Sequence, residues 1–322
     1  MPQSHLPSSR TSTLRHVKRF GLLRAGVGLT LGALVAGLGT GSVGAAPTGA
    51  AVATVTSPAR VVTELPLGGR SIYPGHVLVA YYGTAGTGAL GVLGEDTPDR
   101  ITERLRRAAR PFGADGRTVQ IVYELIVTVA DPHAGADGDY SHDIDNEHVR
   151  RYIRAAHRND ALLVLDLQPG RTDFLTVAKR WRWALRDPWV GLALDPEWRM
   201  APGQVPAQTV GQVGAREINR VSKWLNDLAV RRDHPEKVFV VHQFRSDMVI
   251  GIDRVRDRKR LAMVQHVDGF GTQGQKLATY HTVAEPDRFR MGFKLFYDED
   301  SGLMTPERVS RIRPRVRFVS YQ

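Results

Sequence analysis

The chain has 322 residues and is 42% hydrophobic, which is enough for one large domain with a sizeable core. It contains no cysteine, which excludes disulfide bonds, a thiolate nucleophile and cysteine-bound zinc. Its formal net charge is +11, but the first 45 residues hold five of the 44 basic side chains and no acidic one, so the remainder carries 39 basic against 33 acidic residues. We attribute this moderate positive charge to solubility and not to an anionic partner.

The amino-terminal segment has the layout of a secretory signal. Basic residues up to Arg24 precede an apolar stretch rich in Gly and Ala at 25–38, and small residues follow at 43–45. We therefore predict a signal peptide over residues 1–45 and a secreted or cell-envelope protein. Glycines interrupt the apolar stretch, which falls short of the roughly 20 apolar residues that span a membrane. No stable membrane span is expected after cleavage, and retention of the segment as an anchor is the alternative.

Residues 46–75 are rich in Ala, Thr, Pro and Gly and have no helical or strand periodicity. This composition predicts a linker or an extended lead-in, without a core of its own.

From residue 76 onward, apolar β-type runs alternate with charged amphipathic stretches, as in parallel β/α units. Eight such runs occur, at 76–82, 118–127, 161–168, 190–197, 238–243, 261–266, 289–297 and 316–321. Helices are expected at 98–110, 146–159, 174–185, 211–231 and 306–311. Eight strands in this length predict that residues 76–322 form one (β/α)8 TIM barrel. A doubly wound sheet is the alternative, although the glycine-rich segment after the first run does not open a helix as the phosphate turn of that fold does.

The fourth run ends in two carboxylates. Because side chains alternate across a strand, Asp195 and Glu197 are expected to share one face at the carboxyl-terminal end of the strand, where a barrel presents catalytic groups. Asp166, at the end of the third run, is expected to point into the same mouth. Like charges held close raise at least one pKa, which predicts a proton donor beside an ionised neighbour. The alternative is that Asp195 caps a loop and Glu197 pairs with a nearby arginine.

The sequence Asp195-Pro196-Glu197, followed by Trp198, resembles the D-x-E motif on the fourth strand of chitinase-like and muramidase-like glycoside hydrolases. The resemblance implies that Glu197 donates a proton to the leaving group and that Asp195 assists it. Asp166 would balance charge nearby. In the chitinase-like group further aspartates precede this pair, where the present chain has Val190 and Ala193.

Polar and aromatic residues near the predicted strand ends are candidates for substrate binding, because aromatic rings stack on sugars. They are Tyr82, Glu124, Gln168, Trp198, His242, Gln265, Tyr297 and Tyr321. We therefore predict a secreted glycoside hydrolase that cleaves a cell-envelope or environmental polysaccharide by carboxylate acid–base catalysis. The alternative is a non-catalytic barrel that binds cell-wall glycan. The first measurement for either would be the release of new reducing ends.

Other chemistries find little support in the sequence. No G-x-G-x-x-G opens a predicted helix, and the sequence has no G-x-x-x-x-G-K-[ST], no G-x-S-x-G and no H-E-x-x-H, so no cofactor and no metal are predicted. Asp143, Asp145 and Glu147 could bind a divalent ion, but Asp145 could equally cap the helix that follows. The basic run at 254–260 contains an acid and is interpreted as a solvated surface, so no nucleic-acid partner is expected.

Overall fold

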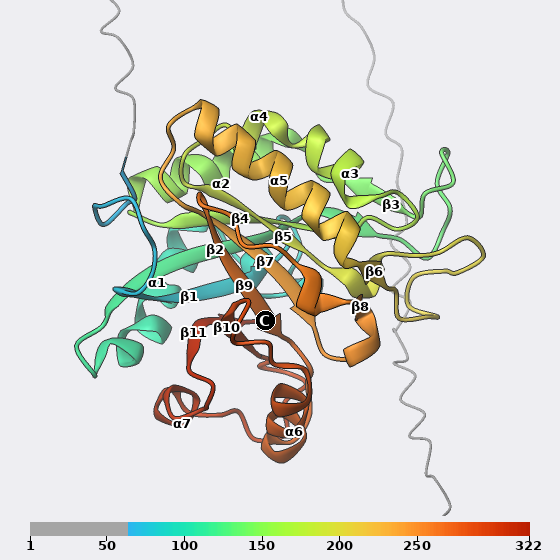
Figure 1. Cartoon of the computed structure of the whole chain (residues 1–322). Helices are drawn as coiled ribbons and strands as arrows, with labels where there is room; N and C mark the ends of the chain where they lie inside the picture. Colours follow the sequence, from blue (N-terminus) through green and yellow to red (C-terminus); the bar gives the residue numbers. More distant parts are fainter. Residues whose placement is uncertain (1–63) are drawn as a thin grey trace, which may run out of the picture. The chain divides into compact units, whose positions relative to one another are not determined.

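The computed structural model describes residues 64–322, which form a closed barrel of eight parallel strands (Figure 1). The strands are β1 (His76–Gly83), β2 (Thr118–Ala130), β4 (Leu162–Leu167), β5 (Val190–Leu194), β7 (Lys237–Gln243), β9 (Leu261–Val267), β10 (Arg290–Leu295) and β11 (Val316–Tyr321). Strand β1 pairs with both β2 and β11, which closes the cylinder. The predicted (β/α)8 TIM barrel is thus confirmed.

Helices cover the outside of the barrel. They are α1 (Pro98–Ala109), α2 (Asn146–Arg158), α3 (Phe174–Arg180), α4 (Arg182–Leu185), α5 (Ala215–Arg231), α6 (Gln273–Val283) and α7 (Pro306–Ser310). Three short strands lie outside the barrel: β3 (Ser141–Asp143), β6 (Val213–Gly214) and β8 (Val249–Ile250). Figure 1 shows α2 to α5 gathered on one side, and α6 and α7 on another. The sequence did not predict α6, because its apolar residues do not gather on one face.

The barrel interior is a core of small and branched side chains. One residue of each alternating pair faces the axis, as Leu78, Val164 and Val240 do, while the other packs against the helices. Leu65 and Ile72 join the interior cluster from the segment before β1. The structure therefore differs from the expectation of a lead-in without core residues, since these two side chains are buried with those of the barrel.

The predicted signal peptide at 1–45 lies outside the described residues, as does most of the lead-in at 46–75. Within residues 64–322, no helix combines the length and the apolar character needed to cross a membrane.

The fourth barrel strand is shorter than the sequence predicted. Strand β5 ends at Leu194, and Pro196–Trp198 form a turn of 3-10 helix. Proline lacks the backbone N–H that a strand needs, so the chain leaves the sheet at Asp195. Glu197 therefore does not continue the strand face on which Asp195 lies.

Candidate active site at the carboxyl-terminal end of the barrel

Each barrel strand carries a buried polar residue two positions after an inward-facing residue; in β2 this residue lies mid-strand, and in the other strands it lies at or next to the carboxyl-terminal end. The eight are Tyr82, Glu124, Asp166, Asp195, His242, His266, Lys294 and Ser320, and none is more than 3% exposed. We call this set the mouth layer. Burying polar and ionisable groups costs free energy, so a complete ring of them is not what core packing would select. The layer lies at the end of the barrel that carries the active site in TIM-barrel enzymes.

His242 lies among three carboxylates. Its Nδ1 is 3.1 Å from Asp268 Oδ2, and its Nε2 is 3.2 Å from Glu124 Oε1 and 3.9 Å from Asp166 Oδ1. Burial alone would lower the pKa of His242, but Asp268 and Glu124 outweigh it and raise the pKa well above its usual value. Burial would likewise raise the pKa of Asp268, yet its contact with His242 lowers it. His242 is therefore an imidazolium clamped between two carboxylates.

Asp166 and Asp195 behave differently from Asp268. Burial raises the pKa of Asp166. The charge of His242 lowers this pKa and the charge of Glu124 raises it, and the pKa of Asp166 is raised overall. Burial, and then the charges of Glu197 and Asp166, raise the pKa of Asp195 well above its usual value. The O–H of Tyr82 donates to Asp166 Oδ2 at 2.7 Å. The layer thus holds two carboxyl groups whose pKa values are raised, which favours their protonated forms.

Several buried polar atoms here have no partner in hydrogen-bond geometry among the described residues. They are both Glu124 oxygens, one oxygen each of Asp166, Asp195 and Asp268, His242 Nε2 and His266 Nδ1. Buried polar groups normally have a partner, so each such atom calls for a reason. Their convergence at one end of the barrel indicates a place where a polar ligand binds.

His266 and Ser320 form a second, uncharged pair. Their Nε2 and Oγ atoms lie 2.9 Å apart. Burial and the neighbouring His242 charge lower the pKa of His266 well below its usual value, so this ring is neutral. Gly292 on β10 leaves room for it, because a Cβ there would lie 2.5 Å from His266 Nδ1.

Gly292→Ala is accordingly expected to displace the His266 ring and to lower the free energy of unfolding by about 1–3 kcal/mol, the usual cost of overpacking. Urea denaturation measures this effect. Gly274→Ala in α6 is the matched control, because nothing lies within 4 Å of a Cβ there. Equal stability of the two variants would show that the space beside His266 does not depend on Gly292.

The mouth layer contains five of the eleven residues that the sequence singled out: Tyr82, Glu124, Asp166, Asp195 and His242. Gln168 is adjacent, and its Nε2 donates to the Tyr82 hydroxyl at 3.4 Å. Glu197 and Trp198 are half-buried in the 3-10 helix beyond β5. The charge of Glu197 acts on Asp195, and the buried Nε1 of Trp198 has no hydrogen-bond partner among the described residues.

Three predicted binding residues lie elsewhere. Gln265 faces the helices, where its amide bonds Gln243 and the backbone carbonyl of Val283. Tyr321 also faces the helices, and its ring stacks on that of Tyr297 at 5.3 Å between centroids. These residues are one position out of phase with the inward face, so the structure corrects their placement.

Four functional candidates were absent from the predicted site: His266, Asp268, Lys294 and Ser320. Each lies two positions after an inward-facing residue of its strand, or four in the case of Asp268. Once the inward face of each strand is known, this two-residue alternation selects His266 in place of Gln265 and Ser320 in place of Tyr321.

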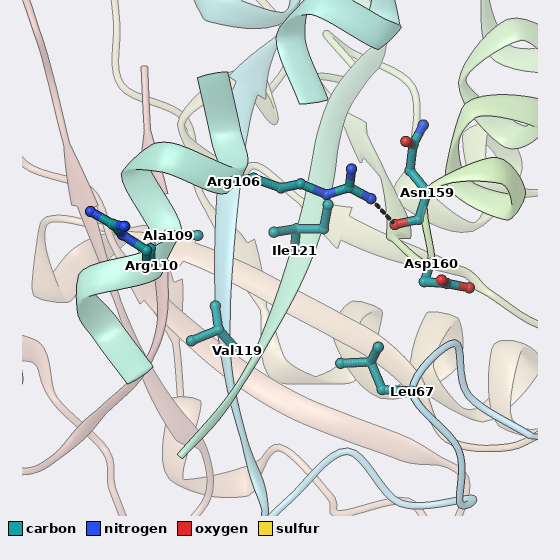
Figure 2. Close-up of a pocket in the computed structure, with 8 residues that line it drawn as sticks. All are labelled: Leu67, Arg106, Ala109, Arg110, Val119, Ile121, Asn159 and Asp160. Atoms are coloured by element: carbon teal, nitrogen blue, oxygen red, sulfur yellow. Dashed lines mark hydrogen bonds between the residues drawn. The ribbon is translucent and has the colours of Figure 1, made fainter. Parts of the chain in front are cut away.

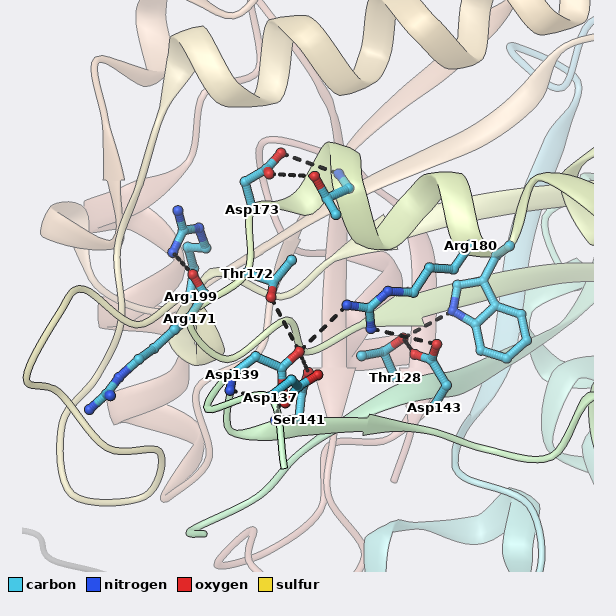
Figure 3. A network of polar contacts seen from close by, with 12 residues as sticks. Thr128, Asp137, Asp139, Ser141, Asp143, Arg171, Thr172, Asp173, Arg180 and Arg199 are labelled. Carbon is cyan, nitrogen blue, oxygen red and sulfur yellow. Dashed lines mark hydrogen bonds and ion pairs between the residues drawn. The ribbon is translucent and has the colours of Figure 1, made fainter. Parts of the chain in front are cut away.

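The acid-rich segment after β2 is tied to the barrel by structural contacts (Figure 3). Asp143 accepts a hydrogen bond from Thr128 Oγ1 at 2.5 Å, and Arg180 pairs with Asp139 and Asp143 at 3.5 and 3.6 Å. Asp145 caps α2 by accepting from the backbone N–H of Glu147. In the described part of the chain, no three such side chains converge as metal ligands would. These acids anchor the loop and cap the helix.

A surface pocket of about 270 Å³ lies away from the mouth layer (Figure 2). Val119 and Ile121, near the start of β2, line it together with Arg106 and Arg110 from the end of α1. The Arg106 guanidinium donates to the backbone carbonyl of Asn159 at 3.1 Å. The pocket thus lies toward the opposite end of β2 from Glu124 and has no part in the chemistry of the layer.

The fold and the layer define a (β/α)8 barrel with a buried, charged site at its catalytic end. No family model matches the chain, and no curated protein does. Among solved structures, one match is a dihydrodipicolinate synthase from Bacillus clausii, with 12% identity, a TM-score of 0.30 and coverage of 68% of this chain. The match spans 61% of the synthase chain. A likeness this weak carries no argument about activity.

The prediction of a glycoside hydrolase, with its alternative of a glycan-binding barrel, is wrong. No family model and no curated protein supports it. The D-x-E resemblance placed Asp195 and Glu197 on one strand face, whereas β5 ends at Leu194 and Glu197 lies in a 3-10 turn. The polysaccharide partner and the secreted location stay predictions.

Proposed function

We propose that this protein is an enzyme that performs general acid–base chemistry on a small polar substrate at the mouth layer. The observation that carries the proposal is the juxtaposition of two buried aspartic acids with raised pKa and a clamped imidazolium. Groups whose environments push their pKa values apart are the usual basis of acid–base catalysis.

Asp195 is the proposed proton donor. Its Oδ1 is buried without a hydrogen-bond partner among the described residues, so a substrate atom can take that position. Burial, and then the neighbouring carboxyl groups of Glu197 and Asp166, favour its protonated form. Once Asp195 has given up its proton, the same surroundings favour the return of that proton. This is the behaviour expected of a general acid that turns over.

His242 is the proposed fixed positive charge. Its contacts with Asp268 and Glu124 hold the ring in one orientation, and the preorganised charge can stabilise negative charge that develops on the substrate. Five of the seven buried atoms without partners are carboxyl oxygens. They favour a substrate with several O–H or N–H donors, because most of these oxygens can only accept.

The test is a substrate search with a matched inactive variant. The full chain is incubated with a mixture of small hydroxylated, amide, ester and carbonyl compounds, and consumption is followed by mass spectrometry. We expect at least one compound to be consumed by the native protein and by Asp253→Asn, an exposed control, but not by Asp195→Asn. Consumption at the same rate by Asp195→Asn would contradict the proposal.

A further inference from the structure

Three lysines of the barrel are buried, and two of them have evident structural partners. Lys237 Nζ donates to the backbone carbonyls of Asp187 and Val190 at 2.5 and 2.8 Å. Lys276 Nζ donates to two backbone carbonyls, each at 2.8 Å, and pairs with Asp300 at 2.9 Å. Such contacts are what a buried ammonium group requires.

Lys294 lacks such partners. Its side chain is in the mouth layer and only 3% exposed, yet the contacts recorded for its Nζ are with aromatic rings, 3.3 Å from the centroid of Tyr82 and 5.4 Å from that of Phe296. No hydrogen bond or ion pair joins this nitrogen to another described residue. The one amine of the layer is thus left available to a ligand.

Lys294 also has acid–base groups around it. Asp166 accepts from the hydroxyl of Tyr82, the residue whose ring Lys294 covers, and this contact occupies Oδ2. Asp166 Oδ1 has no hydrogen-bond partner among residues 64–322, and it is 3.9 Å from His242 Nε2. A proton on Oδ1 would therefore not be engaged by the Tyr82 hydroxyl.

We propose that Lys294 is a nucleophilic amine that captures an uncharged, hydroxylated aldehyde or ketone as an imine, with Asp166 as the proton donor. This inference rests on the proposed acid–base function of the same site. A lysine kept from ion pairing in a desolvated pocket is a recurrent nucleophile toward carbonyl groups.

The reaction balances with the groups present. Lys294 passes one ammonium proton to Asp166, and the resulting amine attacks the carbonyl carbon. A C–N bond forms, and the carbonyl oxygen takes the proton back from Asp166. The nitrogen returns one proton to Asp166, which then protonates the hydroxyl group. Departure of that group as water leaves a protonated imine beside the Asp166 carboxylate. No oxidant or reductant is required.

The mouth layer favours an uncharged carbonyl compound over a keto acid. Glu124 and Asp268 flank the imidazolium and would repel a ligand carboxylate. Hydroxyl groups on the ligand would instead donate to the carboxyl oxygens that lack hydrogen-bond partners.

Borohydride trapping tests the inference on the full native chain. Dihydroxyacetone is the probe, and sodium borohydride reduces any imine to a stable amine, which peptide mass mapping assigns to a lysine. We expect one equivalent of label at Lys294 and none at Lys237 or Lys276, the buried controls. Pyruvate, which carries a carboxylate, should label Lys294 about tenfold less. Lys294→Arg should lose the label.

Three results would overturn the inference: an unlabelled Lys294, labelling of Lys294 no greater than that of exposed Lys179, or equal labelling by pyruvate. Peptide mapping of the native protein distinguishes all three results without any variant. A Lys294→Arg protein that fails to fold therefore does not affect the outcome. If the native protein consumes a substrate in the mixture experiment while Lys294 stays unlabelled, the imine is refuted and the acid–base function stands. If Asp195→Asn is as active as the native protein, the acid–base function itself fails.

Discussion

Replacing His242 with alanine is expected to lower the free energy of unfolding by about 3–5 kcal/mol, because the loss of one partner leaves buried charges without compensation. Asp268 and Glu124 would both lose the imidazolium that lies 3.1 and 3.2 Å away. Urea denaturation of the native and variant proteins at pH 6 measures the difference. His281→Ala, an exposed histidine in α6, serves as control and should change stability by less than about 0.5 kcal/mol.

The pH dependence of the same variant provides a second readout. The pKa of His242 is higher in the folded protein than in the unfolded chain. Its contribution to the free energy of unfolding is therefore fully present below the unfolded-state pKa of about 6.5, and it is lost as pH rises through the folded-state pKa. The gap between native and His242→Ala stability should therefore narrow above pH 6.5. A gap that is constant with pH, or a cost no larger than that of His281→Ala, would mean that His242 is not a buried cation.

Asp195→Asn is expected to have two opposite effects: loss of activity and a gain in stability of roughly 1–3 kcal/mol at pH 7.5. Burial and the neighbouring Glu197 and Asp166 raise the pKa of Asp195 in the folded protein. Asp195 therefore contributes fully to the free energy of unfolding below its unfolded-state pKa of about 3.9. This contribution is lost as pH rises toward its folded-state pKa. An amide has nearly the same shape, cannot ionise, and avoids this loss.

Asp300→Asn is the matched control for the gain in stability. Asp300 is as buried as Asp195, but it pairs with Lys276 at 2.9 Å, so its neutralisation should destabilise the protein by about 3 kcal/mol. Thermal unfolding of both variants from pH 4 to pH 8 separates the two cases. If Asp195→Asn destabilised the protein at pH 7.5 as Asp300→Asn does, Asp195 would be an ionised structural partner and not a proton donor.

A gain in stability on removal of a catalytic group is the expected sign of an active site. Groups held at unfavourable charge states lower stability, and proteins retain them where function needs them. The mouth layer concentrates this cost at one end of the barrel, because the remainder of the interior consists of residues such as Leu78, Val164 and Val240. The two variants together therefore distinguish a functional layer from a merely unusual core.

The sequence by itself determined the barrel and the polar strand ends. Eight apolar runs that alternate with charged amphipathic stretches predict eight parallel strands, and Asp166, Asp195 and His242 lie at or near the ends of such runs. Local chemistry suffices for this, since runs of apolar β-type residues between amphipathic helices have few other ways to bury both faces. The helix cap at Asp145 was likewise among the sequence-based alternatives.

The tertiary structure alone decided which side of each strand faces the axis. Both faces of a barrel strand are buried, so the hydrophobic pattern does not distinguish Gln265 from His266 or Tyr321 from Ser320. The pairing of β1 with β11 closes the cylinder and thereby selects the inward face of every strand. Closure also brings Lys294 over Tyr82, residues 212 positions apart in the chain, a proximity that no local pattern encodes.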